Sequence, residues 1–232
     1  MSVLVLNCGS SSIRFQLHDA AAHRALARGL VSRIGEEGAQ VELQGDDSSE
    51  VQRAPVPDHG RGLELILDAI LDPSTEGAYD ASWVAAVGHR VVHGGTFFTA
   101  PVMLDAGAMA KIEECAPLAP LHNPPALDGI RAALRILPTT PQVAVFDTAF
   151  HATIPARAHV YALPHEYYGE HRVRRYGFHG ISYQAVSQRL DVMLDGGLRE
   201  LRVVIAHLGN GASIAAVDRG RCADTSMGMT PL

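Results

Sequence analysis

Lysine and cysteine are scarce in this chain of 232 residues. Lysine occurs once, at Lys111, and 25 acidic side chains outnumber 19 basic ones, which gives a net charge of −6. Nucleic-acid-binding modules are usually basic, so this composition argues against a nucleic-acid partner. The three cysteines, Cys8, Cys115 and Cys222, form no C-x-x-C pair. This spacing suggests neither a disulfide framework nor a cysteine zinc site, and it fits a reducing compartment.

Long hydrophobic runs are absent as well. No apolar segment approaches the roughly 18 residues of a membrane-spanning helix, and the first residues lack the basic region that opens a secretory signal. The sequence therefore predicts a cytoplasmic protein with no membrane partner. Apolar residues make up 47% of the chain and charged residues 19%, which is ordinary for a folded domain and unlike a disordered chain.

The pattern along the chain predicts an α/β fold. Residues 3–6 read as a buried strand, residues 7–12 (NCGSSS) as a tight polar turn and residues 13–18 as a second strand. A third strand is predicted at 26–33, and residues 35–50 read as a polar excursion. Further helices are predicted at 63–71, 105–115 (with Asp105 as N-cap), 125–137 and 182–194, and further strands at 84–87, 142–146, 203–206 and 214–217.

The opening pattern recurs 200 residues later. Residues 203–217 repeat the order of an apolar run, a polar turn with glycine and a return strand. Gly209 corresponds to Gly9, and Ile214 corresponds to Ile13 after a one-residue insertion. Repeats reveal architecture, and a hairpin followed by only 15 residues cannot close a core. We therefore expect one lobe over residues 1–148 and the beginning of a second, duplicated lobe over 149–232, as in a fragment of a two-lobed protein.

Small residues in the two turns expose backbone N–H groups that can form anion sites. Each turn alone is explained better as an ordinary hairpin turn. The repetition raises the weight of the functional interpretation, in which both turns hold a polyphosphate. Neither turn has the lysine of G-x-x-x-x-G-K-[ST], and residues 209–211 lack the third glycine of the dinucleotide fingerprint. Residues 9–13 also fail the G-x-S-x-G pattern of serine hydrolases.

Residues 88–95 (GHRVVHGG) place Arg90 between two histidines. On a strand His89 and His93 would lie about 13 Å apart, too far for one zinc ion. Arginine is suited to bidentate recognition of carboxylate or phosphate, although a surface or capping role explains Arg90 equally well. Asp147 follows an apolar strand, where open α/β sheets form ligand crevices, or it is an N-cap. His179 lies between glycines and is either a site residue or a packed one.

Taken together, these motifs resemble the acetate kinase (acetokinase) family, in the family's order and along the whole chain. They are NCGSSS at 7–12, HRVVHGG at 89–95, LAPLHNPP at 118–125, FDTAFH at 146–151, YGFHG at 176–180, HLGNGAS at 207–213 and DTSMGMTPL at 224–232. The resemblance implies two ribonuclease-H-like lobes, as in actin and the sugar kinases. It also implies reversible phosphoryl transfer from ATP to acetate, giving ADP and acetyl phosphate, with Mg²⁺ or Mn²⁺, in a homodimer.

The resemblance assigns the phosphate-binding residues as follows. Asn7 would lie near the metal and the phosphates, and Ser10, Ser12 and Arg14 would line the first phosphate loop. Arg14 stands where the family usually has lysine, which keeps the charge but changes its geometry. The second phosphate loop would consist of His207, Leu208, Gly209, Asn210 and Gly211.

The resemblance also assigns the reacting groups. Arg90 would bind the substrate carboxylate and the transferring phosphoryl group, His179 would hydrogen-bond that phosphoryl group, and Asp147 would be catalytic. A carboxylate nucleophile is already ionised at neutral pH, so Asp147 is better interpreted as an orienting group than as an obligatory base. The methyl pocket would be lined by Val92, Leu121, Phe178 and Pro231.

Two alternatives remain open at the level of sequence. A propionate or butyrate kinase of the same superfamily is the nearest, although Val92 narrows the pocket and favours acetate. The other is a truncated, non-catalytic nucleotide-binding module, because the family's second catalytic arginine, adenine-binding segment, distal metal-binding glutamate and C-terminal helix have no counterpart in these 232 residues. We expect little or no kinase activity from these residues alone.

Overall fold

The chain divides into two compact units in a computed structural model that describes residues 2–44, 49–71 and 84–230. The first unit comprises Met1–Val91, Val102–Ala116 and Pro120–Ala144, and the second comprises Val92–Pro101, Pro117–Ala119 and Val145–Leu232. The second unit thus takes in two short segments from earlier in the chain. The lobe boundary placed after residue 148 stays a prediction.

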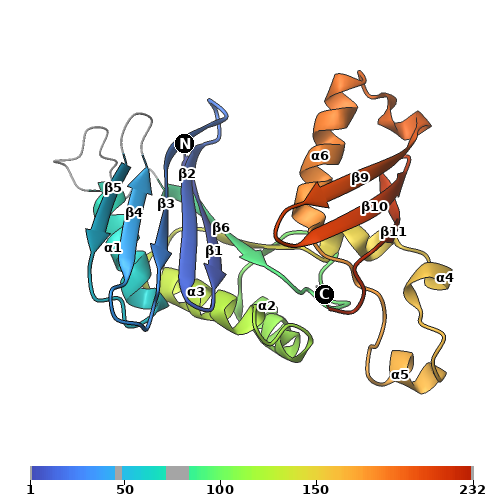
Figure 1. Cartoon of the computed structure of the whole chain (residues 1–232), viewed down its shortest axis with the longest axis horizontal. Coiled ribbons are helices and arrows are strands. Elements are labelled where there is room, and N and C mark those ends of the chain that lie inside the picture. The colour runs from blue at the N-terminus through green and yellow to red at the C-terminus, as the bar shows by residue number, and fades with distance from the viewer. Residues whose placement is uncertain (1, 45–48, 72–83, 231–232) are drawn as a thin grey trace. The chain divides into compact units, whose positions relative to one another are not determined.

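One sheet organises the first unit (Figure 1). Among the described residues it has eight strands in the order β5-β4-β3-β2-β1-β6-β8-β7, and the last residues of β8 enter the second unit. Strands β1 to β5 form antiparallel neighbours in sequence order, whereas β6 joins β1 in parallel. The strands are β1 (Ser2–Gly9), β2 (Ser12–Asp19), β3 (Arg24–Ser32), β4 (Gln40–Gln44), β5 (Ser49–Arg53), β6 (Val84–Val91), β7 (Val102–Met103) and β8 (Gln142–Phe146).

Helices cover one face of this sheet. Helices α1 (His59–Leu71) and α3 (Asn123–Ile136) pack against alternate side chains of the central strands, including Leu4, Leu6 and Ile13, all buried. The alternation of buried and less buried residues along β1 is the period of two expected for a strand with one face in the core. A shorter helix, α2 (Ala106–Glu114), begins where Asp105 Oδ1 accepts the Ala108 N–H at 2.7 Å, which confirms the predicted N-cap.

The polar segment 35–50 was interpreted incorrectly from the sequence. It contributes strand β4 and the start of β5, which pair with each other and, through β4, with β3. Glycine, aspartate and serine disfavour strands locally, but pairing to an existing edge supplies the hydrogen bonds that decide the structure.

The second unit is built on a smaller antiparallel sheet. Its strands are β9 (Arg202–Leu208), β10 (Ala212–Asp218) and β11 (Arg221–Thr225), in the order β11-β10-β9. Helix α6 (Gly180–Met193) and the short helix η3 (Ala149–Thr153) pack on one face, around Tyr183, Ile205 and Val217. The remaining short helices of the described part are η2 (Ala116–Leu118), α4 (Ala156–His159), α5 (His165–Gly169) and η4 (Gly197–Glu200).

The predicted repeat is present in the fold. Strands β1, β2 and β3 form an antiparallel meander, and β9, β10 and β11 form another. In the first unit β1 also pairs in parallel with β6, and β8 follows next in the sheet. This is the ribonuclease-H-like arrangement predicted for the first lobe, so the mixed α/β fold class is confirmed.

A buried glycine sets the distance between α3 and the sheet, and we expect Gly129→Ala to lower the melting temperature. A β-carbon there would overlap the Cys8 sulfur and lie 3.1 Å from the Cys8 Cβ. Overpacking of this kind costs about 1–3 kcal/mol, more than the gain of up to about 1 kcal/mol in helix propensity. Thermal unfolding measures the effect. Gly169→Ala, where no atom lies within 4 Å of the added carbon, is the control. An unchanged melting temperature for Gly129→Ala would contradict the close approach of α3 to Cys8 at this residue.

Candidate functional site

The first hairpin turn, between β1 and β2, is held by a side chain that the sequence analysis did not select. His59, the first residue of α1, is buried and its Nε2–H donates to the Gly9 carbonyl at 2.7 Å. A β-carbon at Gly9 would lie 3.2 Å from Ser12 Oγ, which is tight. The turn that contains Ser10 and Ser12 therefore follows a strand end that the first residue of α1 holds in place. No local sequence signal marks His59, because it lies 50 residues from Gly9.

Asn7, Arg14 and Arg90 come together on three adjacent strands. Asn7 is paired across the ladder with Arg14, and the Arg90 Nη1–H donates to Asn7 Oδ1 at 3.2 Å. The parallel register of β6 with β1, which sets His89 opposite Leu6, makes this contact possible. The structure thus assembles an amide and two guanidinium groups that the sequence analysis selected from separate motifs. Such a set suits an anion.

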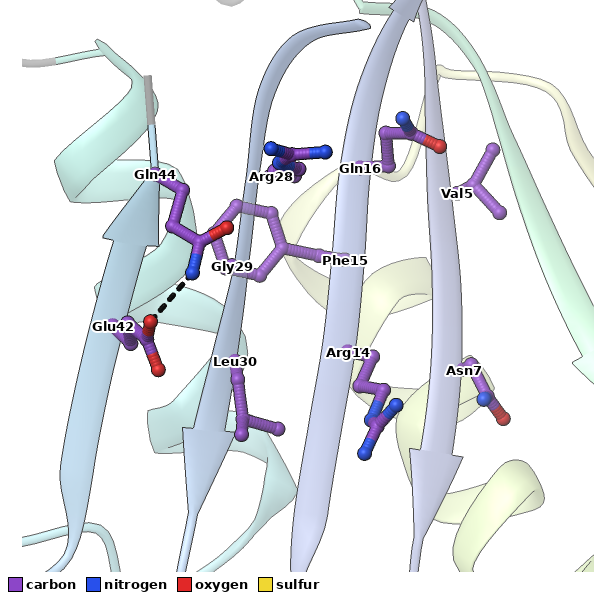
Figure 2. Close-up of a pocket in the computed structure, with 10 residues that line it drawn as sticks. All are labelled: Val5, Asn7, Arg14, Phe15, Gln16, Arg28, Gly29, Leu30, Glu42 and Gln44. Carbon is purple, nitrogen blue, oxygen red and sulfur yellow. Dashed lines mark hydrogen bonds between the residues drawn. The ribbon is translucent and has the colours of Figure 1, made fainter. Parts of the chain in front are cut away.

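Asn7 and Arg14 also line a hollow of about 430 Å³ on the sheet face of the first unit opposite α1 and α3 (Figure 2). They lie at one end of it, and Gln16 and Arg28 lie at the other. The full lining is Val5, Asn7, Arg14, Phe15, Gln16, Arg28, Gly29, Leu30, Glu42 and Gln44.

His89 has a structural role in the first unit. It is buried, and its Nε2–H donates to Gln142 Oε1 at 2.8 Å, while the Gln142 amide nitrogen donates to the Leu137 carbonyl at 3.4 Å. Burial lowers the pKa of His89 to about 4, against the opposing effect of the Gln142 bond. The imidazole is thus neutral at physiological pH and joins β6 to β8.

In the second unit, the end of β8 meets the beginning of α6. The Gly180 N–H donates to the Asp147 carbonyl at 2.9 Å, and a β-carbon at Gly180 would collide with that carbonyl and approach Phe150 Cβ to 2.9 Å. Glycine is therefore required at residue 180. His179, at the N-cap position, adopts a left-handed conformation with φ 59°, which is uncommon for a residue with a side chain. Asp147 is buried beside this junction.

The second hairpin turn, residues 209–211, adjoins His179. The His179 ring stacks on the His207 ring with centroids 4.1 Å apart, and a β-carbon at Gly211 would lie 3.5 Å from His179 Nε2 and Cε1. His207 is fixed in turn by a bond of 2.9 Å between its Nδ1 and Ser182 Oγ. The structure thus brings together His179, His207 and Gly211, which the sequence places in two motifs. Asn210 and Leu208 have exposed side chains.

Ser213 and Tyr183 extend this cluster and were not selected from the sequence. Ser213 Oγ lies 2.8 Å from His179 Nδ1 and 2.6 Å from the Tyr183 hydroxyl, and both residues are buried. Ser213 is the last residue of the HLGNGAS motif at 207–213, but nothing in the sequence links it to Tyr183.

Two of the four residues predicted for a methyl pocket are in contact. Val92 and Phe178 form a buried apolar cluster with Met227, which the sequence analysis did not select. Leu121 belongs to the first unit and its side chain is 74% exposed. Pro231 lies outside the described residues.

Two further buried histidines support the second unit. His93 accepts the Gly95 N–H on Nδ1 at 3.0 Å and packs edge-on against Tyr176. His151 donates from Nε2 to the Phe178 carbonyl at 2.8 Å, and its Nδ1 lies 3.1 Å from Cys222 Sγ. Burial lowers the pKa of each imidazole to about 4. Both rings are therefore neutral at physiological pH, and their role is to hold neighbouring segments of the second unit together.

Neither a metal cluster nor a membrane span is evident in the described ranges. Within residues 2–44, 49–71 and 84–230, no group of three or more His, Cys, Asp or Glu side chains is placed to hold a metal ion. Over the same ranges, no helix combines the length and the apolar character needed to cross a membrane.

The fold and these side-chain sets define a mixed α/β protein with a small-residue hairpin turn in each unit, each turn flanked by basic or imidazole side chains. The chain belongs to the acetokinase family, whose model matches residues 2–232. It is 50% identical over its whole length to the acetate kinase of Thermotoga petrophila and 47% identical to that of Agathobacter rectalis. It spans 58% of the length of each of these relatives.

Solved structures agree with this assignment. The crystal structure of Porphyromonas gingivalis acetate kinase matches 99% of this chain with a TM-score of 0.94 at 44% identity. A propionate kinase from Francisella tularensis matches the same share with a TM-score of 0.92 at 40% identity. In both cases the matched part is 58% of the solved chain.

The buried neutral histidines predict a loss of stability in mild acid. Burial lowers the pKa values of His89, His93 and His151 to about 4 in the folded chain, from the ordinary value of 6.5. The unfolded chain therefore binds more protons between these two pH values. The free energy of unfolding should therefore fall as the pH drops from about 6.5 to 4, with a slope of at most about 4 kcal/mol per pH unit. Thermal unfolding at several pH values measures it.

His89→Gln should make this dependence shallower, and the same change at exposed His165 should not. A melting temperature that stays constant from pH 7 to pH 4.5 would contradict the buried, neutral state of these rings.

Proposed function

We propose that the protein containing this chain is a carboxylate kinase that transfers the γ-phosphoryl group of ATP reversibly to acetate, giving acetyl phosphate and ADP. The observation that carries the proposal is the cluster of the second unit, in which His179 lies against the glycine turn 209–211 beside buried Asp147. Membership of the acetokinase family supports it. Because the chain spans 58% of its relatives, the activity is proposed for the intact protein.

The chemistry requires the charges that these clusters supply. Acetate is ionised at neutral pH and needs no general base to become a nucleophile. The main barrier is repulsion between this anion and the γ-phosphate, so catalysis depends on positioning and on neutralising the phosphoryl oxygens. In this proposal Arg90 binds the carboxylate and the phosphoryl group, and His179 donates a hydrogen bond to that group. Asp147 orients a cationic partner or a water molecule. A single placed cation such as Arg90 can serve this purpose in a chain whose net charge is −6.

The two hairpin turns are the proposed phosphate-binding elements. In the first unit, the residues on or beside the β1–β2 turn are Asn7, Ser10, Ser12 and Arg14. The His59 ring holds this turn by a hydrogen bond to the Gly9 carbonyl. Arg14 supplies a cation to phosphate oxygens in the place of the family's usual lysine. In the second unit, the proposed loop consists of His207, Leu208, Gly209, Asn210 and Gly211.

Mg²⁺ or Mn²⁺ is proposed as part of the nucleotide substrate. Mg²⁺ is usually held by one or two carboxylates together with substrate phosphates, and the described residues offer no multidentate cage. Asn7 Oδ1 already accepts a bond from Arg90, so this amide suits a metal that arrives with phosphate oxygens better than a resident ion. When bound, the metal would neutralise phosphate charge.

Propionate is the second candidate acceptor, and the likeness to a propionate kinase structure favours its consideration. The proposed acceptor pocket uses Val92, Phe178 and Met227, which are in contact, with Leu121 and Pro231 assigned only by resemblance. The two γ-methyl groups of Val92 would limit the space for the additional methylene group of propionate. We therefore propose acetate as the preferred acceptor.

The remaining expectations are proposals of the same kind. We propose two lobes with a boundary near residue 148, a homodimeric and cytoplasmic protein, and no nucleic-acid or membrane partner. The three cysteines are buried and unbridged, which supports a reducing compartment.

The test of the proposed function is a hydroxamate assay for acetyl phosphate, with the intact protein, ATP, Mg²⁺ and acetate. We expect robust turnover that requires ATP, Mg²⁺ and acetate. We expect Arg90→Ala to lower kcat/KM by at least 100-fold, because the negative charge of the acetate and of the phosphoryl group is left uncompensated. Arg131→Ala, which removes an exposed ion-paired arginine, is the matched control. Near-normal turnover in Arg90→Ala would overturn the assignment. Nucleotide binding without acetyl phosphate formation would favour a non-catalytic module.

A second prediction concerns the acceptor pocket. Val92→Ala should raise kcat/KM for propionate relative to acetate by about 10-fold, because one methylene in an apolar pocket is worth about 1–3 kcal/mol. Competition between the two acids in the same assay measures the ratio. Val186→Ala, at an exposed position of α6, should leave the ratio unchanged, and the same ratio in Val92→Ala as in the wild type would contradict the assignment of Val92.

A further inference from the structure

The β1–β2 turn is anchored by two hydrogen-bond donors that lie outside the hairpin. His59 Nε2–H donates to the Gly9 carbonyl at 2.7 Å, and the Ile34 N–H donates to the Ser11 carbonyl at 3.0 Å. Both distances are those of good hydrogen bonds. Because a carbonyl oxygen can only accept a hydrogen bond, the proton of the first bond lies on His59 Nε2. The direction of both bonds is therefore fixed by the chemistry of the acceptors.

His59 belongs to a helix end that packs against the same hairpin. The Asp58 side chain accepts the Arg61 N–H at 2.9 Å and so caps α1. Three residues after His59, a β-carbon at Gly62 would lie only 3.0 Å from Ile13 Cδ1, because the helix lies close against β2. The His59 residue is 8% exposed. Its bond to the Gly9 carbonyl therefore joins the turn to a helix end that is itself fixed.

This bond sets the orientation of the peptide group between Gly9 and Ser10. In a trans peptide the C=O and the following N–H lie in one plane and point in opposite directions. His59 holds the carbonyl from the face of the sheet that α1 covers, so the Ser10 N–H points towards the opposite face. That face carries Asn7 and Arg14 (Figure 2). The peptide thus adds an N–H donor on this side, where a carbonyl oxygen would repel an anion.

We propose that His59 is a positioning residue that holds the Gly9 carbonyl and thereby keeps the Ser10 N–H presented to a phosphate oxygen of the nucleotide. The proposal rests on the proposed function in that the ligand is a nucleoside polyphosphate. His59 acts through the peptide group and need not touch the nucleotide. Without its bond the peptide group can rotate, and the carbonyl oxygen then faces the phosphate in place of the N–H.

The first test compares two substitutions of His59 in the intact protein. His59→Leu removes the donor, whereas His59→Gln returns an amide N–H near the position of Nε2. Calorimetric titration with MgATP in the absence of acetate should give a dissociation constant about 10-fold higher for His59→Leu, the loss expected for one good hydrogen bond. His59→Gln should restore most of the affinity. The dissociation constant of adenosine, which has no phosphate, should not change, and His165→Leu, at an exposed histidine, is the matched control.

Three results would overturn the proposal. One is an unchanged affinity for MgATP in His59→Leu. The second is an equal loss of affinity for adenosine and MgATP, because the phosphate is then not the group affected. The third is a loss in His59→Gln as large as that in His59→Leu, because the packing of the ring and not its donor is then the cause.

A second test removes the presented N–H itself. Ser10 does not have a positive φ, and proline is compatible with the first central position of type I and type II turns. Ser10→Pro therefore removes the N–H, whereas Ser10→Ala keeps it and loses the same hydroxyl group. MgATP should bind about 10-fold more weakly to Ser10→Pro than to Ser10→Ala.

The two tests are joined by a double-mutant cycle. In the Ser10→Pro background, His59→Leu should cause little further loss of MgATP affinity, because both substitutions remove the same donor. Additive losses would contradict a role of His59 through Ser10. If the wild type binds MgATP but makes no acetyl phosphate, the proposed function fails, whereas these affinities still decide the role of His59.

Discussion

The second unit depends on a backbone contact that leaves no space for a side chain. The Gly180 N–H meets the Asp147 carbonyl at 2.9 Å, and any β-carbon at Gly180 would collide with that carbonyl. This contact joins the end of β8 to the first turn of α6. It places His179 at the junction in a left-handed conformation, and a conformation of this kind persists only where the surroundings over-determine it.

The surroundings of His179 supply that restraint from several directions. His151 bonds the carbonyl of the preceding residue, Phe178, and His207 stacks on the ring. Ser213 bonds the Nδ1 edge of the ring and is itself bonded to the Tyr183 hydroxyl, and the Nε2 edge lies toward Gly211. The position of the imidazole is therefore fixed before any ligand binds. Such preorganisation is the usual source of electrostatic stabilisation in phosphoryl transfer.

Sequence periodicity was sufficient where structure is local and insufficient where it depends on distant partners. The hairpin of β1 and β2, its repeat in β9 and β10, and the Asp105 cap follow from neighbouring residues. Within residues 35–50, β4 forms on the edge that β3 offers, and the start of β5 pairs with β4, which the composition of the segment does not reveal. Similarly, the sequence identified His179 and His207 separately, but their stacking and the contacts of His59, Ser213 and Tyr183 join residues 28 to 50 positions apart.

We propose that His179 and the Gly209–Gly211 turn form a single phosphate-binding site. A titration of the intact protein with ADP and Mg²⁺, followed through the His179 Nε2 resonance and the Gly209 and Gly211 amides, tests it most directly. All three signals should shift together and report the same dissociation constant. Saturating nucleotide binding that leaves the His179 signal unmoved, or that shifts the ring and the amides with different constants, would contradict it.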